Sequence, residues 1–385
     1  LIVSGYSQEI VGGVSNTGVV EVYAGVAGDV PDVVPNAAFP GVFNGDLYGT
    51  RLESLDDLDG DGLGDLFVYA SRAEEHGIHV GSPYFQSTAE LTGPVLLDNP
   101  GNASGQRAGW DVAIVGDVNG DGQEDALVGV PEYDNAGNQI NAGLTQVFFG
   151  GPNGPSPTAW ELKEFDRYSD SDRWAWKVSP AGDFNGDGLP DFAVLARYDD
   201  RPSSFSSSVY ANPSDCPGNV SNTGAVAIFL GSGTGLPETS PAFLWYGPES
   251  GDTVRNLDGG FDYNGDGFDD LIVGGMDWDG DDGTTNVGGF EIIEGRPDVG
   301  GGTFVICNDG PWFEGEEANG RLGRDVAGLG DIDNDGCDET AIGAYDEDFG
   351  YANQGLVRVL WGYGPGCGSN EAEVSILAPQ DSNAR

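Results

Sequence analysis

An acidic nine-residue segment occurs five times in this chain, and its repetition constrains the fold more than any other feature. We call the copies loops 1 to 5: 57–65 (DLDGDGLGD), 117–125 (DVNGDGQED), 183–191 (DFNGDGLPD), 262–270 (DYNGDGFDD) and 331–339 (DIDNDGCDE). Positions 1, 3, 5 and 9 carry a carboxylate or amide oxygen, and small residues at positions 4 and 6 let the backbone curl these oxygens inward. Calcium takes about six to eight such oxygens, so each loop is predicted to bind one ion.

The residues that follow each loop argue against an EF-hand. That motif also begins D-x-[DN]-x-[DN]-G, but it requires a bidentate Glu at position 12 and flanking helices. Position 12 here is always Val or Ile within an apolar run: Val68, Val128, Val194, Val273 and Ile342. Secreted β-roll repeats of nine residues do not match the spacing. The alternative to a cation site is an Asp-Gly hairpin turn without metal.

The spacing of the loops predicts an all-β fold. Their first residues lie 60, 66, 79 and 69 positions apart, about 68 on average. Each unit contains a strand, the loop, a buried apolar strand, a variable connection, an alternating strand and a fourth strand. A long period with four short strands is typical of a β-propeller with four-stranded antiparallel blades. We count six units in a single domain, 1–385: about 1–45, 46–100, 101–165, 166–248, 249–310 and 311–385.

The first unit lacks a first strand and a calcium loop. Leu1 begins where a second strand begins, and the chain ends on an Asn-Ala-Arg sequence that resembles the residues before a first strand. The hypothesis is that the native chain continues upstream of Leu1 or is cut near Arg385, and that the missing piece closes the ring.

Three further patterns locate elements within the units. An Arg precedes each loop, in 49–51, 105–107, 172–173, 254–255 and 320–321, and it marks entry to the first strand. Arg107, Arg173 and Arg321 lie ten residues before the first Asp of their loops, whereas Arg51 and Arg255 are closer. Trp160, Trp245 and Trp312 fall in or near fourth strands, where packing in the core is expected. The Ser-rich insertion 197–222 explains the longest interval and is predicted to be an exposed loop.

Charge and hydropathy exclude several classes of partner. The net charge is -49, from 64 acidic and 15 basic residues, so the surface repels nucleic acid and anionic membranes. No apolar run approaches the roughly 18 residues of a membrane helix.

The four cysteines Cys216, Cys307, Cys337 and Cys367 allow three disulfide pairings, between which the sequence does not choose. Disulfides and calcium both point to an extracellular or cell-surface location.

The unit resembles the FG-GAP repeat of the integrin alpha-subunit head, D-x-[DN]-x-D-G-x-x-D followed by L-x-V-G-x-P and later G-x-V-x-V. Residues 117–131 (DVNGDGQEDALVGVP) with 143–150 (GLTQVFFG) match it best. The resemblance implies a calcium ion in the hairpin between first and second strands, bound by side chains at positions 1, 3, 5 and 9 and the carbonyl at 7. The implied ligands are Asp57, Asp59, Asp61, Leu63 and Asp65; Asp117, Asn119, Asp121, Gln123 and Asp125; Asp183, Asn185, Asp187, Leu189 and Asp191; Asp262, Asn264, Asp266, Phe268 and Asp270; and Asp331, Asp333, Asp335, Cys337 and Glu339.

Two features depart from the family pattern. Loop 5 has Asn334 at position 4 and Glu339 at position 9, which makes Asp331, Asp333 and Asp335 firmer candidates than Glu339. The family norm is seven blades, whereas the length of this chain fits six better.

The resemblance implies a non-enzymatic extracellular scaffold for adhesion or protein–protein interaction. Its ligand would be a protein or glycan at the cell surface or in the extracellular matrix, and the scaffold could belong to a larger assembly or a longer polypeptide. The binding face would lie opposite the calcium loops, where the connections are long and variable: Glu132–Ala142, Arg197–Asn222, Asp277–Asn286 and Asp309–Asn319.

Two alternatives stay open. A carbohydrate-binding propeller could hold sugars with exposed Trp and Tyr beside acids and calcium. A hydrolase or lyase on the same fold would need a catalytic constellation, and the only histidines, His76 and His79, are expected to point to different faces of a strand. We therefore expect no enzymatic activity.

Overall fold

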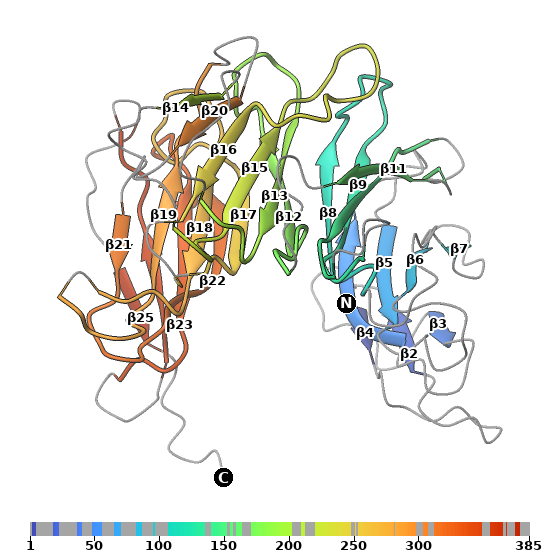
Figure 1. The fold of residues 1–385 in the computed structure, drawn as a ribbon. Coiled ribbons are helices and arrows are strands. Elements are labelled where there is room, and N and C mark those ends of the chain that lie inside the picture. The colour runs from blue at the N-terminus through green and yellow to red at the C-terminus, as the bar shows by residue number, and fades with distance from the viewer. Residues whose placement is uncertain are drawn as a thin grey trace. The chain divides into compact units, whose positions relative to one another are not determined.

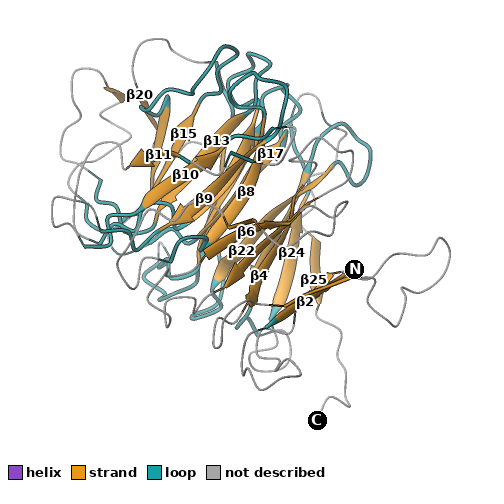
Figure 2. Cartoon of the chain, turned by 90° about the vertical axis from the view of Figure 1, so that its right-hand side faces the viewer, coloured by secondary structure: helices purple, strands orange, loops and turns teal. Residues whose placement is uncertain are grey.

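The computed structural model contains strands and loops but no helix among the residues that it describes (Figure 2). No described segment could therefore cross a membrane as a helix. The described residues are 2–4, 18–22, 37–40, 48–55, 65–70, 82–86, 95–96, 107–134, 140–151, 155–156, 159–163, 171–201, 209–211, 220–247, 251, 253–280, 282–297, 303–306, 312–348, 355–364, 367 and 374–377.

The chain divides into two compact units, each of which contains several sheets. Unit 1 comprises 1–114 and 122–175, and unit 2 comprises 115–121 and 176–385. The strands up to β11 form one three-stranded and two four-stranded sheets, with β8 running across the division at Ile114 (Figure 1). They are β1 (Ile2–Ser4), β2 (Val19–Val22) and β3 (Ala37–Pro40); β4 (Tyr48–Leu55), β5 (Asp65–Ala70), β6 (Ser82–Gln86) and β7 (Val95–Leu96); and β8 (Asp111–Gly116), β9 (Asp125–Val130), β10 (Leu144–Phe148) and β11 (Trp160–Lys163).

Unit 2 contains three further sheets. The strands are β12 (Lys177–Gly182), β13 (Asp191–Ala196), β14 (Val209–Ala211), β15 (Ala225–Phe229), β16 (Phe243–Tyr246) and β20 (Thr303–Ile306); β17 (Asn256–Phe261), β18 (Asp270–Gly275), β19 (Gly289–Ile293) and β21 (Trp312–Glu314); and β22 (Leu322–Gly330), β23 (Glu339–Ala344), β24 (Leu356–Leu360) and β25 (Val374–Leu377). The first strands β12, β17 and β22 lie next to one another. The prediction of an all-β chain with repeated antiparallel sheets is confirmed.

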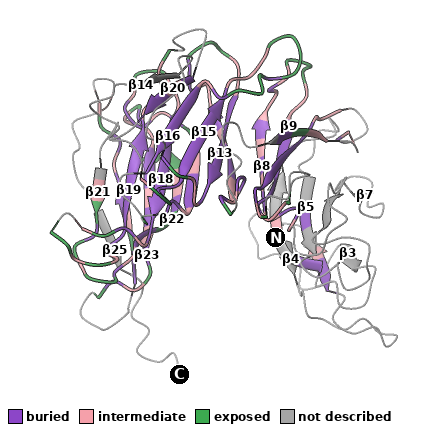
Figure 3. Cartoon of the chain, viewed as in Figure 1, coloured by how far each residue is buried: buried purple, intermediate pink, exposed green. Residues whose placement is uncertain are grey.

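The strands that follow loops 2, 3 and 4 are fully buried. Every residue of β9, β13 and β18 is buried (Figure 3). These strands pair on both sides, for example Leu144 with Val130 in β10 and β9, so their apolar side chains cover both faces of the sheet. A continuous apolar run is the pattern expected of such a strand.

The core of unit 2 joins two neighbouring sheets. It contains Leu195 of β13 and Ile228 of β15 together with Leu257 of β17 and Val273 of β18. Trp245 on β16 lies in this cluster with no exposed surface, which confirms its predicted place in the core. Trp278, which the sequence analysis did not single out, is equally buried in the same cluster.

The insertion 197–222, predicted to be an exposed loop, has buried residues at its N-terminal end, whereas 202–208 and 212–219 lie outside the described residues. Arg197 and Arg201 are only 6% and 3% exposed, and Arg201 pairs with Val220 as an isolated bridge. The guanidinium of Arg197 stacks over the rings of Trp176 and Tyr198. These contacts anchor both ends of the insertion, so part of it belongs to the framework.

Two strands also depart from the purely antiparallel pattern. β20 pairs in parallel with β16 of the preceding sheet, and β14, which lies inside the insertion, pairs in parallel with β20. The fourth strand of the β17 sheet is instead β21. Together β20 and β14 extend this sheet to six strands, and only β14 comes from the insertion.

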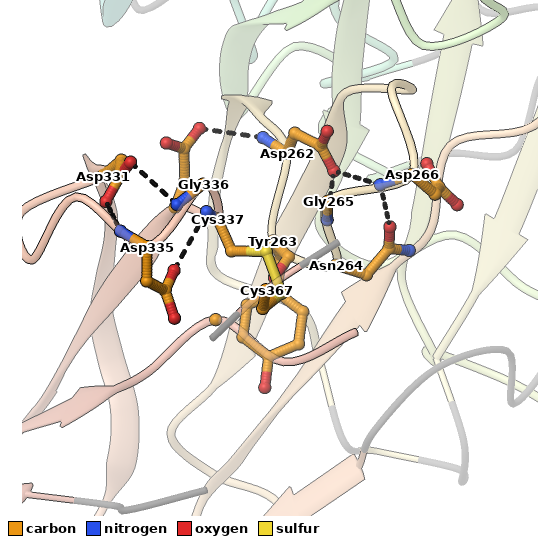
Figure 4. The surroundings of a disulfide bond; sticks show 12 residues. Asp262, Tyr263, Asn264, Gly265, Asp266, Asp331, Asp335, Gly336, Cys337 and Cys367 are labelled. Carbon is orange, nitrogen blue, oxygen red and sulfur yellow. Dashed lines mark hydrogen bonds between the residues drawn. A yellow bond between two sulfur atoms is a disulfide. The ribbon is translucent and has the colours of Figure 1, made fainter. Parts of the chain in front are cut away.

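A disulfide joins loop 5 to the segment that follows β24. Cys337, at position 7 of the loop, is bonded to Cys367 across 30 residues of sequence. Cys367 lies beside Tyr263 of loop 4, whose carbonyl also accepts a hydrogen bond from the N–H of Tyr363 (Figure 4). Cys216 and Cys307 lie outside the described residues.

Of the three pairings that four cysteines allow, only one contains the Cys337–Cys367 bond. We therefore predict that peptide mapping without reduction recovers 337–367 and 216–307 as the cross-linked peptides. Replacement of Cys337 and Cys367 by Ser should lower the free energy of unfolding by about 3 to 4 kcal/mol, because the 30-residue loop is no longer closed in the unfolded chain. A peptide that links Cys337 to any other cysteine would contradict this assignment.

Candidate metal-binding loops

The four described acidic loops occupy the same place in their sheets. Loops 2, 3, 4 and 5 connect β8 to β9, β12 to β13, β17 to β18 and β22 to β23, and position 9 is in each case the first residue of the second strand. The hairpin position predicted from the sequence is therefore correct for these four loops. The ligand positions of loop 1 fall on residues whose side chains lie outside the described part of the chain.

Side chains at positions 1, 3 and 5 turn inward and accept hydrogen bonds from the loop's own backbone. In loop 4, the N–H of Asp266 donates to Asp262 Oδ1 (3.1 Å) and to Asn264 Oδ1 (2.9 Å), as Figure 4 shows. The next two N–H groups donate to Asp262 Oδ2 (2.9 Å) and Asp266 Oδ1 (3.0 Å). Loop 5 repeats all four bonds, and loops 2 and 3 repeat part of the set.

Positive φ angles at positions 4 and 6 make this inward turn possible. Position 4 has φ of 75° at Gly120, 75° at Gly186 and 69° at Gly265, and position 6 has φ between 87° and 98°. Asn334 adopts the same conformation in loop 5, with φ of 61°. Asn tolerates the left-handed region better than most residues, so this departure from the repeat leaves the loop geometry unchanged.

The acid at position 9 connects each loop to the end of the third strand. One of its oxygens accepts a hydrogen bond from a Gly N–H there: Asp125 from Gly150 (2.9 Å), Asp191 from Gly231 (2.9 Å), Asp270 from Gly295 (2.7 Å) and Glu339 from Gly362 (3.4 Å). In loops 3 to 5 the second oxygen accepts a backbone N–H within the loop. Glu339 thus makes both of the contacts that Asp makes in loops 3 and 4.

The carboxylate at position 9 loses hydration because it is buried, and this disfavours its charged form. Burial raises the pKa of Asp191 to about 7, opposed by hydrogen bonds from Gly231 and Asn185 and reinforced by Asp187 and Asp183. The pKa of Asp270 is raised to about 7 by the same cause, with Asp262 and Asp266 adding to the effect. Burial also raises the pKa of Glu339. A cation inside the loop would offset this cost.

The donor set fits a hard cation. In loop 5, Asp331, Asp333 and Asp335 place one carboxylate oxygen each within 4.8 Å of one another. In loop 3, Asp183 Oδ1 is buried and has no hydrogen-bond partner among the described residues. Oxygen donors, clustered acids and a buried carboxylate oxygen available for coordination are the chemistry that calcium requires. The position-7 carbonyls remain predicted ligands.

Loops 2, 3 and 4 each contact the sheet that follows in unit 2. The carbonyl at position 2 accepts an N–H from just beyond the next sheet's third strand: Val118 from Ser232 (2.8 Å), Phe184 from Arg296 (2.8 Å) and Tyr263 from Tyr363 (3.0 Å). The sequence analysis missed these bonds because they use backbone atoms of residues whose side chains vary. Their only sequence signal is the Gly that ends each third strand.

The connections between second and third strands have a repeated framework of their own. An Asp carboxylate accepts the N–H of an Asn two residues before the Gly at the third strand: Asp134 from Asn141 (2.8 Å), Asp200 from Asn222 (2.7 Å) and Asp279 from Asn286 (2.8 Å). The recurrent N-x-G triplet was a signal that the sequence analysis did not use. This closure holds the ends of each connection and leaves its length variable.

The Arg before each first strand belongs to the same framework. Arg107 and Arg173 both pair with Glu132 (3.0 and 3.7 Å), Arg255 pairs with Asp277 (3.3 Å), and Arg321 pairs with Asp346 (3.8 Å). Each acid lies just after a second strand. The predicted marker of strand entry is thus correct for these four residues, and it also fixes the start of the variable connection. His76 and His79 lie outside the described residues.

Comparison with known proteins supports the resemblance to integrin alpha subunits. Integrin alpha-IIb of Mus musculus is 32% identical over 169 residues, which cover 43% of this chain and 14% of the relative. Integrin alpha-PS2 of Drosophila melanogaster is 30% identical over 191 residues, 46% of this chain and 12% of the relative. Phosphatidylinositol-glycan-specific phospholipase D of Rattus norvegicus is 30% identical over 175 residues, 43% of this chain and 18% of the relative. The chain thus spans less than a fifth of these proteins, and no family model matches it.

The left-handed conformation of Asn334 generates a prediction that needs no metal. Asn334 is exposed and sits at φ of 61°. Asn334→Ala should lower the free energy of unfolding by about 1 kcal/mol. Ala is disfavoured in the left-handed region because its Cβ crowds the backbone and it lacks the polar side chain with which Asn can hydrogen-bond locally. Asn334→Gly is the matched control and should be close to neutral. Equal losses for both variants in denaturant unfolding would show that the side chain, and not φ, decides stability.

Proposed function

We propose that this chain is a non-enzymatic, extracellular, calcium-stabilised β-propeller scaffold for adhesion or protein–protein interaction. The observation that carries the proposal is the common construction of the acidic hairpin loops, with inward oxygens at positions 1, 3 and 5 and a buried acid at position 9. Relatives named as integrin alpha subunits support it.

The propeller is supported by the repetition of the sheets. Antiparallel four-stranded sheets recur along the chain, and in unit 2 their first strands are neighbours, as they are around the axis of a propeller. We propose one domain over 1–385 built from the six predicted units. The parallel strands β14 and β20 are then additions to the outer edge of one blade.

Calcium would be held by the residues already assigned to the five loops. The ion would supply positive charge where each loop concentrates acids. It would use oxygens that accept backbone hydrogen bonds and, in loop 3, Asp183 Oδ1, which has no partner among the described residues. The chain's own residues contribute preorganisation: Gly or Asn at position 4 turns the backbone, and position 9 anchors the loop to the third strand. Metal binding would therefore be linked to folding.

The proposed ligand surface is formed by the variable connections between second and third strands. Their ends are held by the Asp–Asn closures and the Arg ion pairs, so different sequences can be presented on one framework. An exposed apolar side chain lies in one such connection of each unit: Ile140, 59% exposed, in unit 1 and Tyr345, 43% exposed, in unit 2. A protein ligand is favoured over a glycan because each Trp whose side-chain burial is described is buried or half-buried, so none of these indoles is exposed for sugar stacking.

A hydrolase is the second candidate, and one observation favours it. Relatives named phosphatidylinositol-glycan-specific phospholipase D match the chain as extensively as the integrin alpha subunits do. The chain covers 18% of these relatives, so the match can reflect a shared non-catalytic module. Release of a glycosylphosphatidylinositol-anchored reporter from vesicles by the purified chain would decide for the hydrolase.

The first experiment measures the effect of calcium on stability. The melting temperature should fall by at least about 10 °C when calcium is removed with a chelator, and it should return on addition of calcium but not of the same concentration of sodium. Asp335→Ala should reduce the calcium-dependent gain, whereas Asp282→Ala, an exposed acid outside the loops, should leave it unchanged. An identical melt with and without calcium would refute the proposal.

The second experiment tests adhesion. The immobilised chain should retain intact cells of its source in calcium and lose them in chelator. Ile140→Ser and Tyr345→Ala should weaken retention at least about fivefold, because exposed apolar and aromatic groups dominate such contacts. Leu236→Ser, which removes an apolar side chain that is 58% exposed elsewhere, is the matched control. Equal retention by all three variants would contradict the assigned surface.

A further inference from the structure

Neighbouring metal loops in unit 2 are joined by a reciprocal pair of hydrogen bonds. The N–H of Asp183, at position 1 of loop 3, donates to Asp269 Oδ2 (2.6 Å), and the N–H of Asp269 donates to the Asp183 carbonyl (3.3 Å). Asp269 occupies position 8 of loop 4. The same two bonds join loops 4 and 5: Asp262 donates to Asp338 Oδ2 (2.9 Å), and Asp338 donates to the Asp262 carbonyl (2.9 Å).

Gly182 makes room for the position-8 carboxylate at the contact between loops 3 and 4. A Cβ added to Gly182, which precedes position 1 of loop 3, would lie 2.0 Å from Asp269 Oδ2, so Gly leaves room for this carboxylate. At the contact between loops 4 and 5 the corresponding residue is Phe261, and Asp338 still reaches the N–H of Asp262. Asp269 is half-buried, and burial raises its pKa while the Asp183 hydrogen bond lowers it. Position 8 is not one of the proposed calcium ligands, although it directly precedes one.

The contact between loops 2 and 3 lacks this pair. Position 8 of loop 3 is Pro190, which has neither an N–H nor a carboxylate, so neither bond can form. Its ring instead lies over Gly116, the residue that corresponds to Gly182. The protein thus contains two linked contacts and one unlinked contact, all three of which share the hydrogen bond to the position-2 carbonyl.

We propose that Asp269 and Asp338 are positioning residues that couple calcium binding between loops 3, 4 and 5, while Pro190 leaves loop 2 independent of loop 3. This inference rests on the proposed function of the loops as calcium sites. Calcium in loop 4 would order 262–270, and with it Asp269, which then fixes the backbone of Asp183 at the first ligand position of loop 3. Loop 3 would bind its own ion with less ordering still to be done, which is positive cooperativity.

The test resolves calcium binding loop by loop in the full chain. Hydrogen–deuterium exchange of peptides that cover loops 2, 3, 4 and 5 is measured over a series of free calcium concentrations, and each loop's midpoint of protection is recorded. Asp266→Ala disables loop 4 by removing a proposed ligand. It should raise the midpoint of loop 3 by about fivefold or more, the usual lower range for coupled sites, and leave the midpoint of loop 2 unchanged.

A double-mutant cycle then assigns the coupling to position 8. In an Asp269→Ala background, Asp266→Ala should produce no further shift in loop 3, because the connection is already lost. Asp338→Ala should uncouple loops 4 and 5 in the same way, and it keeps the test valid if Asp269→Ala does not fold. Asp282→Ala removes the same charge outside the loops and should leave all midpoints unchanged.

The outcomes separate this inference from the proposed function. If no loop of the unaltered protein gains protection with calcium, the calcium sites and the coupling both fail. If the loops are protected but loop 3 keeps its midpoint in Asp266→Ala, only the coupling fails. A midpoint that falls in that variant, as repulsion between neighbouring ions would cause, also overturns it.

Discussion

The crowding of carboxylates in short hairpin loops is the constraint on which the rest of this structure depends. Three acids approach within 4.8 Å in loop 5, and in every described loop a further acid lies buried at position 9. Backbone N–H groups stabilise part of this negative charge. Burial nevertheless raises the pKa of Asp191 and of Asp270 to about 7, so their charged forms remain disfavoured. The loops are also part of the sheet framework. Position 9 connects them to the third strands, and position 2 connects them to the next sheet in unit 2.

A second framework lies where second strands lead into third strands. Asp–Asn closures and Arg ion pairs recur there at fixed points, whereas the residues between them differ in number and kind. The insertion 197–222 illustrates the tolerance of this arrangement, since its N-terminal end contains buried residues and one of its strands extends a sheet. A conserved geometry with variable connections is the architecture that a binding scaffold needs.

Much of this organisation could be predicted from the sequence because the repeat carries it. The repeated nine-residue segment of acids and glycines placed the hairpins, and the apolar run after each loop identified the buried second strands. Asn334 and Glu339 looked like departures, yet Asn shares the φ of Gly and Glu339 reaches the same N–H groups as Asp. In these cases the local chemistry of one residue is sufficient to decide the structure.

Other features depend on contacts between distant segments and leave no periodic signal. Examples are the parallel pairing of β16 with β20, the choice of Cys367 as the partner of Cys337, and the bond from Asp183 to Asp269 across 86 residues. Position 8 varies among Gly, Glu, Pro and Asp, so the repeat alone gives it no role. The role of an acid at position 8 is visible only in the folded structure, where its carboxylate accepts the N–H of position 1 in the neighbouring loop.

The most direct test of the central claim is the number of calcium ions that the folded chain binds. Isothermal titration of the metal-free protein, with the bound calcium checked by elemental analysis after dialysis, measures that number. Our account predicts about five ions per chain, one for each acidic loop. A folded protein that retains no calcium above the dialysis buffer would contradict it.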